Sequence, residues 1–397
     1  MIRRQLALGL AGACAAAGLL SGRSLLSGAT APVETGGGGP IVPAEPARVL
    51  GVPLPRIFSC FGSGLAAPDE TRRYGAVIWH RTPENLRLLR AARAQHPDLV
   101  ALMYRELYCV LRHETQLGES TGGWMWLDRH HSDWFQLDRG GRRVEIPDYP
   151  GRWMMDLREP GWREFWIEKT LRDVVEGGWD GVFVDDALTS LGAHQLPPLA
   201  GYAEDADLQA AVGEFLAAIT AAFHRHGKLV IANVSNTDEY PGLWASWLAA
   251  TDGLMEEHFA GDGWTWGRHA GERQLEALQE AARQGKWVLC LTYGDWTDQP
   301  RMETSLAAYL SGAGERTLWS YRPYANADQP AWHASWEPSL GAPLGEAERN
   351  GAVWRRRFEH GIAVVNAGTA PVTVEADGQP LRLQAREGRL IRHEEAR

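Results

Sequence analysis

Short apolar runs recur along the chain between residues 56 and 323, each bounded by glycine, proline or charged residues. Runs that are rich in β-branched and aromatic residues and lack a polar face are typical of strands buried on both sides. Eight such runs are present, at residues 56–62, 74–80, 99–106, 181–186, 228–236, 252–259, 287–295 and 317–323. We therefore expect eight buried strands in this part of the chain.

Most of these runs are separated by segments whose apolar residues recur at helical spacing. Helices are expected from Thr82-Pro83, from Pro160, and over residues 207–226, 271–284 and 302–310. Strands that alternate with helices over this length predict an α/β fold of the (β/α)8 TIM barrel type. A doubly wound open sheet is the alternative. It fits less well, because polar residues follow nearly every strand, which suits a ring of loops around a barrel mouth better than a single crevice.

The alternation of predicted strands and helices stops on both sides of the predicted barrel, which spans residues 56–330. Residues 1–31 have the positive, apolar and small-residue order of an export signal peptide, and Arg3-Arg4 resembles the twin-arginine type. Cys14 is a poor match to a lipoprotein attachment site, and the apolar run is too short to span a bilayer comfortably. Residues 32–55 and 331–350 form linkers, and short strands within 351–397 predict a small antiparallel β domain.

Composition narrows the classes of partner. The chain has 40 Lys and Arg against 50 Asp and Glu, and this net charge of −10 argues against nucleic acid or an anionic membrane as the partner. Its 18 Trp residues suit stacking on the sugar rings of an oligo- or polysaccharide, although indoles also fill ordinary cores. Three cysteines outside the signal peptide lack metal-type spacing and are expected as buried free thiols: Cys60, Cys109 and Cys290. The sequence predicts no cofactor and does not indicate an oligomeric state.

Two of the predicted strands share a sequence pattern, the Asp-Gly frame: each begins with Asp-Gly and ends with an acidic residue. Asp185 follows Asp180-Gly181 at the same offset at which Glu257 follows Asp252-Gly253. If both strands belong to one parallel barrel, the two carboxylates lie together at the carboxyl end of the barrel, its mouth. A glycosidase requires at least two such carboxylates. Asp185 alternates with Phe183 and is the candidate nucleophile or electrostatic stabiliser.

Glu257 is the candidate general acid/base, because the flanking Met255 and Phe259 provide the apolar surroundings that raise the pKa of a proton-donating carboxyl. A structural alternative for any single strand-end acid is a helix cap or a loop salt bridge. A chemical alternative is a divalent-metal site made of Asp185, Asp186 and Glu257 near His258. Neither a His-rich nor an Asp-x-Asp spacing supports such a site, so no metal is predicted.

Other polar side chains at strand ends and in loops are candidates for substrate binding. Sugars require a ring of hydrogen-bond donors and acceptors, although each of these groups could equally be a structural polar residue. Asp156, which precedes a predicted helix, could also cap that helix. The irregular stretch between the third and fourth runs carries several Trp and is expected to be a functional lid. The candidates are His80, Tyr104, Arg105, Trp124, Trp126, Asp156, Asp186, Asn233, Asn236, Tyr293 and Asp295, with Tyr321 and Arg322 after the eighth run.

Several segments together resemble a known group of enzymes. They are residues 153–157, 162–166, 179–186, 252–257 and 356–366. The chain is similar, over most of residues 56–375, to TIM-barrel proteins labelled hypothetical glycosyl hydrolases, distant relatives of polygalactosaminidase-like and α-galactosidase-type barrels. In the α-galactosidase-type barrels the catalytic acids follow strands four and six. The resemblance therefore implies these roles for Asp185 and Glu257, with Asp186 and Glu256 as immediate neighbours.

These observations favour an exported, periplasmic or extracellular, glycoside hydrolase that acts on an oligo- or polysaccharide through two carboxylates. A non-catalytic carbohydrate-binding barrel is the alternative, in which the acids serve only as structural groups. A transglycosylase would use the same carboxylates with a sugar acceptor in place of water. Retention or inversion of configuration depends on the separation of the two carboxylates.

Overall fold

The computed structural model describes residues 56–60, 68–112, 123–234, 240, 242–261, 270–323, 332–333, 336, 340–376 and 378–393. The predicted signal peptide with Cys14, the linker over residues 32–55 and the candidate Asn236 lie outside the described residues.

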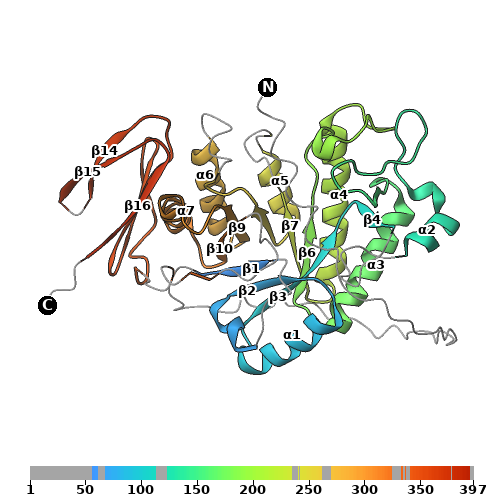
Figure 1. The fold of residues 1–397 in the computed structure, drawn as a ribbon, viewed down its shortest axis with the longest axis horizontal. Coiled ribbons are helices and arrows are strands. Elements are labelled where there is room, and N and C mark those ends of the chain that lie inside the picture. The colour runs from blue at the N-terminus through green and yellow to red at the C-terminus, as the bar shows by residue number, and fades with distance from the viewer. Residues whose placement is uncertain are drawn as a thin grey trace.

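Eight parallel strands form a closed barrel (Figure 1). Their order follows the chain: β1 (Phe58–Cys60), β2 (Ala76–Trp79), β3 (Val100–Glu106), β6 (Gly181–Asp185), β7 (Leu229–Asn233), β8 (Gly253–Glu256), β9 (Trp287–Tyr293) and β10 (Thr317–Arg322). A parallel bridge between Ile57 and Trp319 joins the last strand to the first, and the Trp319 amide donates to the Arg56 carbonyl at 2.8 Å. The predicted (β/α)8 barrel is therefore confirmed, and the open-sheet alternative is wrong.

Within the described residues, the helices that surround the barrel are α1 (Pro83–Gln95), α3 (Pro160–Gly177), α4 (Asp205–His224), α5 (Leu243–Ala250), α6 (Ala270–Arg283) and α7 (Gln299–Gly312). The Thr82 hydroxyl caps α1 by accepting from the Asn85 amide, as the sequence predicts. Helix α5 is not apparent from the sequence, because its short and mostly apolar segment lacks a polar face. Within the described residues α4 is long and apolar enough to cross a membrane by composition, but 50% of its most apolar window is buried in the protein.

The segment between β3 and α3 is more regular than the sequence indicates. Strand β4 (Cys109–Leu111) pairs antiparallel with β5 (Arg152–Met154), and helix α2 (Trp124–His130) lies between them in sequence. Leu127, Phe135 and Ile146 are buried in this excursion. Their spacing matches neither a helix nor a strand, so the sequence predicted an irregular loop where the structure has an ordered excursion with buried apolar residues.

The C-terminal part is a small antiparallel unit packed on helix α7 (Figure 1). Strands β11 (Glu348–Asn350), β12 (Val353–Phe358), β13 (Gly361–Asn366) and β16 (Glu387–Arg392) form a sheet, and β14 (Val372–Ala376) and β15 (Gln379–Leu383) form a hairpin. The Gly388 amide donates to the Thr304 hydroxyl at 3.1 Å, and the Leu390 amide donates to Glu303 at 3.1 Å. Backbone hydrogen bonds therefore join this sheet to the barrel's last helix.

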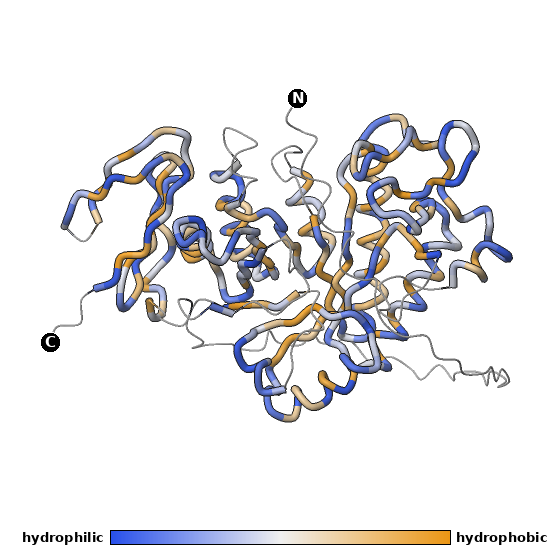
Figure 2. The backbone as a smooth tube through the Cα atoms, in the orientation of Figure 1, coloured by the Kyte–Doolittle hydropathy of each residue, from blue (hydrophilic) through white to orange (hydrophobic). Residues whose placement is uncertain are grey.

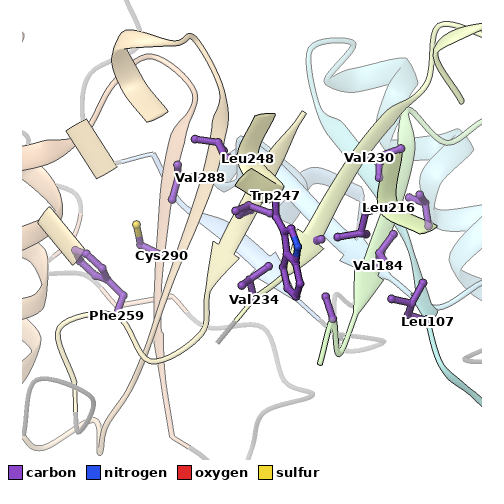
Figure 3. Close-up of a cluster of buried hydrophobic side chains, with 14 of the residues drawn as sticks. Leu107, Val184, Leu216, Val230, Val234, Trp247, Leu248, Phe259, Val288 and Cys290 are labelled. Carbon is purple, nitrogen blue, oxygen red and sulfur yellow. The ribbon is translucent and has the colours of Figure 1, made fainter. Parts of the chain in front are cut away.

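Side chains of the barrel strands alternate between two apolar layers. Phe183 of β6 belongs to the cluster that fills the barrel, whereas Val184 belongs to the cluster between the strands and the helices. Figure 3 shows this outer layer, where Val184 and Val230 lie near Leu216 of α4. Figure 2 shows the same division along the chain, with hydrophobic strands at the centre and hydrophilic loops at the periphery. Because alternation is strict, Asp185 faces the barrel interior, as predicted.

The repeated Asp-Gly frame has a structural function at the opposite end of the strands. Asp180 accepts from the Ala101 amide at 2.7 Å, and Asp252 accepts from the Val230 amide at 2.8 Å. A Cβ atom on the glycine that follows Asp180, Gly181, would lie 2.2 Å from the Leu229 carbonyl oxygen. The frame therefore ties neighbouring strands together closely and fixes the position of the strand that carries Asp185.

Replacing Gly181 with alanine tests this close approach. The added methyl group would force β6 away from β7, and we expect the free energy of unfolding to fall by about 1–3 kcal/mol. The midpoint of thermal or denaturant unfolding measures this loss. Gly345→Ala is the control, because nothing lies within 4 Å of a Cβ atom at that position. Equal midpoints for the two variants would contradict the proposed role of Gly181.

Candidate active site

Inward-facing polar side chains form a ring at the carboxyl end of the barrel. Alternation along each strand brings to one mouth residues that lie far apart in the sequence. Hydrogen bonds, ring contacts and burial place the following residues in this ring: His80, Tyr104, Glu106, Asp185, Asn233, Glu257, Tyr293 and Arg322. Seven of the eight, all but Glu106, are candidates that the sequence analysis named as catalytic or substrate-binding.

The side chain of Asn233 joins the two candidate catalytic acids. Its amide nitrogen donates to Asp185 Oδ1 at 2.8 Å and to Glu257 Oε2 at 2.6 Å. Because both oxygens bond to the same nitrogen, they are at most 5.4 Å apart. The structure therefore brings Asp185 and Glu257 together in one mouth.

Each of these two acids also contacts a tyrosine hydroxyl. Tyr293 donates to Glu257 Oε1 at 2.8 Å, and the Tyr104 hydroxyl lies within hydrogen-bond distance of Asp185 Oδ2. Both tyrosines belong to the apolar cluster inside the barrel, so their rings are fixed by packing. The hydroxyls and the Asn233 amide thus orient the carboxylates, and among the described residues neither acid has an ion pair with a cation.

The surroundings of Asp185 favour its protonated form. Burial raises the pKa of this carboxyl, and the negative charges of Glu106, Asp186 and Glu257 raise it further. The hydrogen bond from Tyr104 acts in the opposite direction but is the smaller effect. The pKa of Asp185 is therefore well above the ordinary value for aspartate, an effect that the sequence analysis did not predict for this residue.

Asp186 turns away from Asp185 and belongs to a second cluster beside the pair. Its backbone adopts a left-handed conformation with φ of 59°, which ends the strand. His194 Nε2 lies 3.0 Å from Asp186 Oδ2, the Tyr108 hydroxyl donates to the same carboxylate at 3.2 Å, and Asp148 lies 3.9 Å from the other imidazole nitrogen. Burial alone would lower the pKa of His194, but these carboxylates raise it to about 9.

Glu106 is the ring residue that the sequence analysis missed. It is only 1% exposed, forms an ion pair with Arg152 of β5, and lies opposite Asp185 in the pairing of β3 with β6. The alternation of the third run could have identified it, since Glu106 shares the inner face with Tyr104. The sequence analysis instead selected the intervening Arg105.

Arg105 does not lie in the barrel mouth. Its guanidinium is 2% exposed and forms an ion pair with Asp173 of helix α3 at 2.8 Å, on the outer side of the barrel. The prediction that Arg105 contacts substrate is therefore wrong, because the residue after an inward-facing one must face outward. Glu256 likewise faces outward, where Gln274 of helix α6 donates to it at 3.3 Å. Of the neighbouring acids, Glu257 is the one in the mouth.

Two further candidates are held in local turns rather than in the ring. Asp156 pairs with Arg158 at 3.0 Å in the turn before α3. Asp295 is exposed and accepts from the amide of Thr297 at 2.8 Å and from its hydroxyl at 2.6 Å. Both residues therefore make local structural contacts, but the helix-cap alternative for Asp156 is wrong, because Glu159 caps α3 by accepting from the Gly161 amide at 3.1 Å.

The candidate tryptophans belong to the excursion between β3 and α3. Trp124 contacts Phe135 and Trp153, each with ring centroids 6.3 Å apart. Trp126 is 45% exposed and stacks on Phe165 of α3 at 5.6 Å. Among the described residues, the aromatic partners of both indoles belong to this excursion or to α3, so the structure does not bring them to the carboxylate pair.

The described residues contain no cluster of three or more His, Cys, Asp or Glu side chains arranged to hold a metal ion. The metal-site alternative for Asp185, Asp186 and Glu257 thus has no support among them. All three cysteines in the described ranges are buried free thiols, as predicted. One of them, Cys60, lies inside the barrel, where Arg322 donates to its carbonyl oxygen at 2.8 Å.

The Asp186–His194 pair predicts a measurable titration. In Asp186→Asn, the imidazole loses its main anionic partner while it stays buried, so its pKa should fall clearly below about 9, although Glu106 and Asp148 still raise it. Histidine NMR titration measures this change. Because the pKa is raised in the native protein, the pair's contribution to stability is present below pH 6.5 and is lost as the pH rises through 9.

His80 is the internal control for this titration. Its pKa is lowered to about 4, first by burial and then by the charges of Arg152 and Arg105, and it should not respond to Asp186→Asn. A midpoint for His194 that stays near 9 in the variant would show that another group sets its pKa.

Comparison with known proteins identifies one family and several solved structures to which the chain is similar. A family model described as hypothetical glycosyl hydrolase family 15 matches residues 93–362. No curated protein matches the chain. The glycoside hydrolase domain of PelA from Pseudomonas aeruginosa is 16% identical, with 69% of this chain and 97% of that chain covered and a TM-score of 0.43. The maltogenic α-amylase AmyB from Thermotoga neapolitana is 12% identical, with 85% and 98% covered and a TM-score of 0.44.

Proposed function

Because the chain belongs to the hypothetical glycosyl hydrolase family 15, we propose that it is a retaining glycoside hydrolase of oligo- or polysaccharides. In this proposal Asp185 is the nucleophile and Glu257 is the general acid/base. The observation that carries it is the single Asn233 amide that donates to both carboxylates.

The separation of the two acids supports a retaining mechanism. Retaining glycosidases hold their two carboxyl groups about 5–5.5 Å apart, whereas inverting enzymes leave about 6.5–9.5 Å for a water molecule. The bridged oxygens of Asp185 and Glu257 are at most 5.4 Å apart, because they lie 2.8 Å and 2.6 Å from one nitrogen atom. This spacing suits direct attack by one carboxylate on the sugar.

The reaction proceeds in two steps in this proposal. Glu257 gives its proton to the glycosidic oxygen as Asp185 attacks the anomeric carbon, so the leaving sugar departs and a glycosyl ester forms. Glu257, now ionised, takes a proton from water, and the resulting hydroxide attacks the same carbon and releases Asp185. The anomeric configuration is inverted twice and therefore retained.

The surrounding ring suits both steps. Asp185 has the shorter side chain of the two acids, and Tyr104 and Asn233 fix its position at the end of its strand. A nucleophile must be held in place in this way. Glu257 lies in the turn after β8, where its longer side chain can reach a glycosidic oxygen. The candidate contacts to sugar hydroxyls are His80, Tyr104, Asp186, Asn233 and Tyr293.

Azide rescue of two alanine variants tests the roles of the acids. With activated aryl glycosides as probes, Asp185→Ala should regain turnover with azide and give a glycosyl azide of inverted configuration. Glu257→Ala should give the product of retained configuration. Without azide, we expect Glu257→Gln to lose roughly 10²–10⁴-fold in kcat for a poor leaving group. Product configuration is read by proton NMR.

Glu256→Gln is the matched control, because this adjacent carboxylate faces Gln274 outside the barrel. It should keep wild-type turnover. Full activity in Asp185→Asn or Glu257→Gln, with a protein that is folded by circular dichroism, would contradict the assignment of these two residues as catalytic. Sugar binding without any product from the wild-type protein would favour the carbohydrate-binding alternative.

We also propose that the enzyme is exported, with residues 1–31 as its signal peptide and Arg3-Arg4 as the twin-arginine pair. Export would bring the active site to polysaccharides outside the cytoplasm. Changing Arg3-Arg4 to Lys-Lys should retain the precursor in the cytoplasm of a bacterial host, as measured by cell fractionation and immunoblotting. Unchanged export of that variant would rule out the twin-arginine route.

A further inference from the structure

The hydroxyl of Tyr104 lies between two carboxylates that come from neighbouring strands. It is within hydrogen-bond distance of Asp185 Oδ2, and it lies 3.0 Å from Glu106 Oε1. The same Glu106 oxygen receives the guanidinium of Arg152. A continuous chain of oxygen atoms therefore connects the candidate nucleophile with a buried, ion-paired carboxylate.

A count of protons shows what this chain requires. A tyrosine hydroxyl has one hydrogen, so it can donate to only one of the two carboxylates at a time. The other contact is a hydrogen bond only if that carboxyl carries a proton and donates it to the tyrosine oxygen. Glu106 is paired with Arg152, whereas burial and three neighbouring acids raise the pKa of Asp185, so in the resting site the extra proton resides on Asp185.

We propose that Glu106 is a positioning residue that accepts the proton of Asp185 through Tyr104 when Asp185 becomes the nucleophile. The inference rests on the proposed function, since it concerns how that nucleophile is formed. It assigns a role to Glu106, a residue with no direct contact to Asp185 among the hydrogen bonds of the described residues.

The transfer balances without an external acid or base. Asp185 gives its proton to the Tyr104 oxygen as Tyr104 gives its own proton to Glu106. One O–H bond breaks and one forms at Tyr104, which stays neutral throughout. Asp185 ends as a carboxylate that accepts a hydrogen bond from Tyr104, and Glu106 ends protonated. Departure of the sugar from Asp185 in the second step lets the proton return by the same path.

Among the described residues, the charged groups around Asp185 favour the protonated form of this carboxyl. Glu106 approaches from β3, Glu257 from the turn after β8, and Asp186 is the next residue in the chain. The nearby cations pair with other acids: Arg152 pairs with Glu106, and His194 pairs with Asp186. The three acids and burial raise the pKa of Asp185, while the Tyr104 hydrogen bond lowers it.

Two substitutions should shift this pKa in opposite directions. Glu106→Gln removes a neighbouring negative charge, so the pKa of Asp185 should fall by roughly one unit or more. Tyr104→Phe removes the hydroxyl that stabilises the carboxylate and disconnects Glu106, so the pKa should rise. A general disturbance of the site would not give shifts of opposite sign.

The first measurement is a carbon-13 NMR titration of the carboxyl groups in the free protein, with Asp185 assigned by its absence in Asp185→Asn. The second is the pH profile of kcat/KM on an aryl glycoside. Its acid limb should move to lower pH in Glu106→Gln and to higher pH in Tyr104→Phe. Glu256→Gln is the control, because it removes a buried carboxylate that faces outward, and it should shift neither measurement.

The outcomes separate this inference from the proposed function. Opposite shifts in the NMR titration support the relay, even if no glycoside is hydrolysed and the proposed function fails. An Asp185 titration that is unchanged in either variant, or that moves in the same direction in both, would overturn it. Tyr104→Phe leaves the Glu106–Arg152 ion pair intact, so the test stands even if Glu106→Gln does not fold.

Discussion

Strict alternation of side chains along closed parallel strands is the constraint on which the candidate site depends. Phe183, Ile231 and Met255 fill the barrel interior. The next inward position on β6 is Asp185, and the next on β7 is Asn233, so both must face the mouth above this apolar layer. Closure through Trp319 and Arg56 completes the ring by bringing β10 beside β1.

Electrostatics divides the acids of the mouth into two kinds. Glu106 and Asp186 each have a cationic partner, Arg152 or His194. The hydrogen-bond partners of Asp185 and Glu257 are instead neutral groups, namely the Asn233 amide and the tyrosine hydroxyls. An ion-paired carboxylate is stabilised in its charged form, whereas one held by neutral donors can more readily exchange a proton. This difference supports the proposed assignment of Asp185 and Glu257 as the catalytic pair.

The fold also separates the parts that provide stability from those that provide chemistry. Asp180 and Gly181 tie β6 to its neighbours at one end of the barrel, and Asp185 lies at the other end of the same strand. The repeated Asp-Gly frame thus serves to align neighbouring strands. Its coincidence with the catalytic candidates follows from strand length, since strands aligned at one end also end together in the mouth.

The sequence by itself determined the barrel, the C-terminal β unit and the two acids, because these follow from local periodicity. A period of two placed Asp185 on the face of Phe183, and matched offsets related it to Glu257. The sequence analysis did not resolve the excursion that contains α2, β4 and β5, because its apolar residues follow no regular period. Nor did it distinguish Arg105, which faces helix α3, from Glu106, which faces the mouth.

Only the tertiary structure decided which polar groups form hydrogen bonds and ion pairs with one another. The bridge through Asn233, the ion pair of Glu106 with Arg152 and the contact of Asp186 with His194 join residues from different strands and loops. The pKa of Asp185 depends on these neighbours and on burial, and neither can be read from local sequence. Periodicity fixes the direction in which a side chain points, but distances between strands exist only once the barrel has closed.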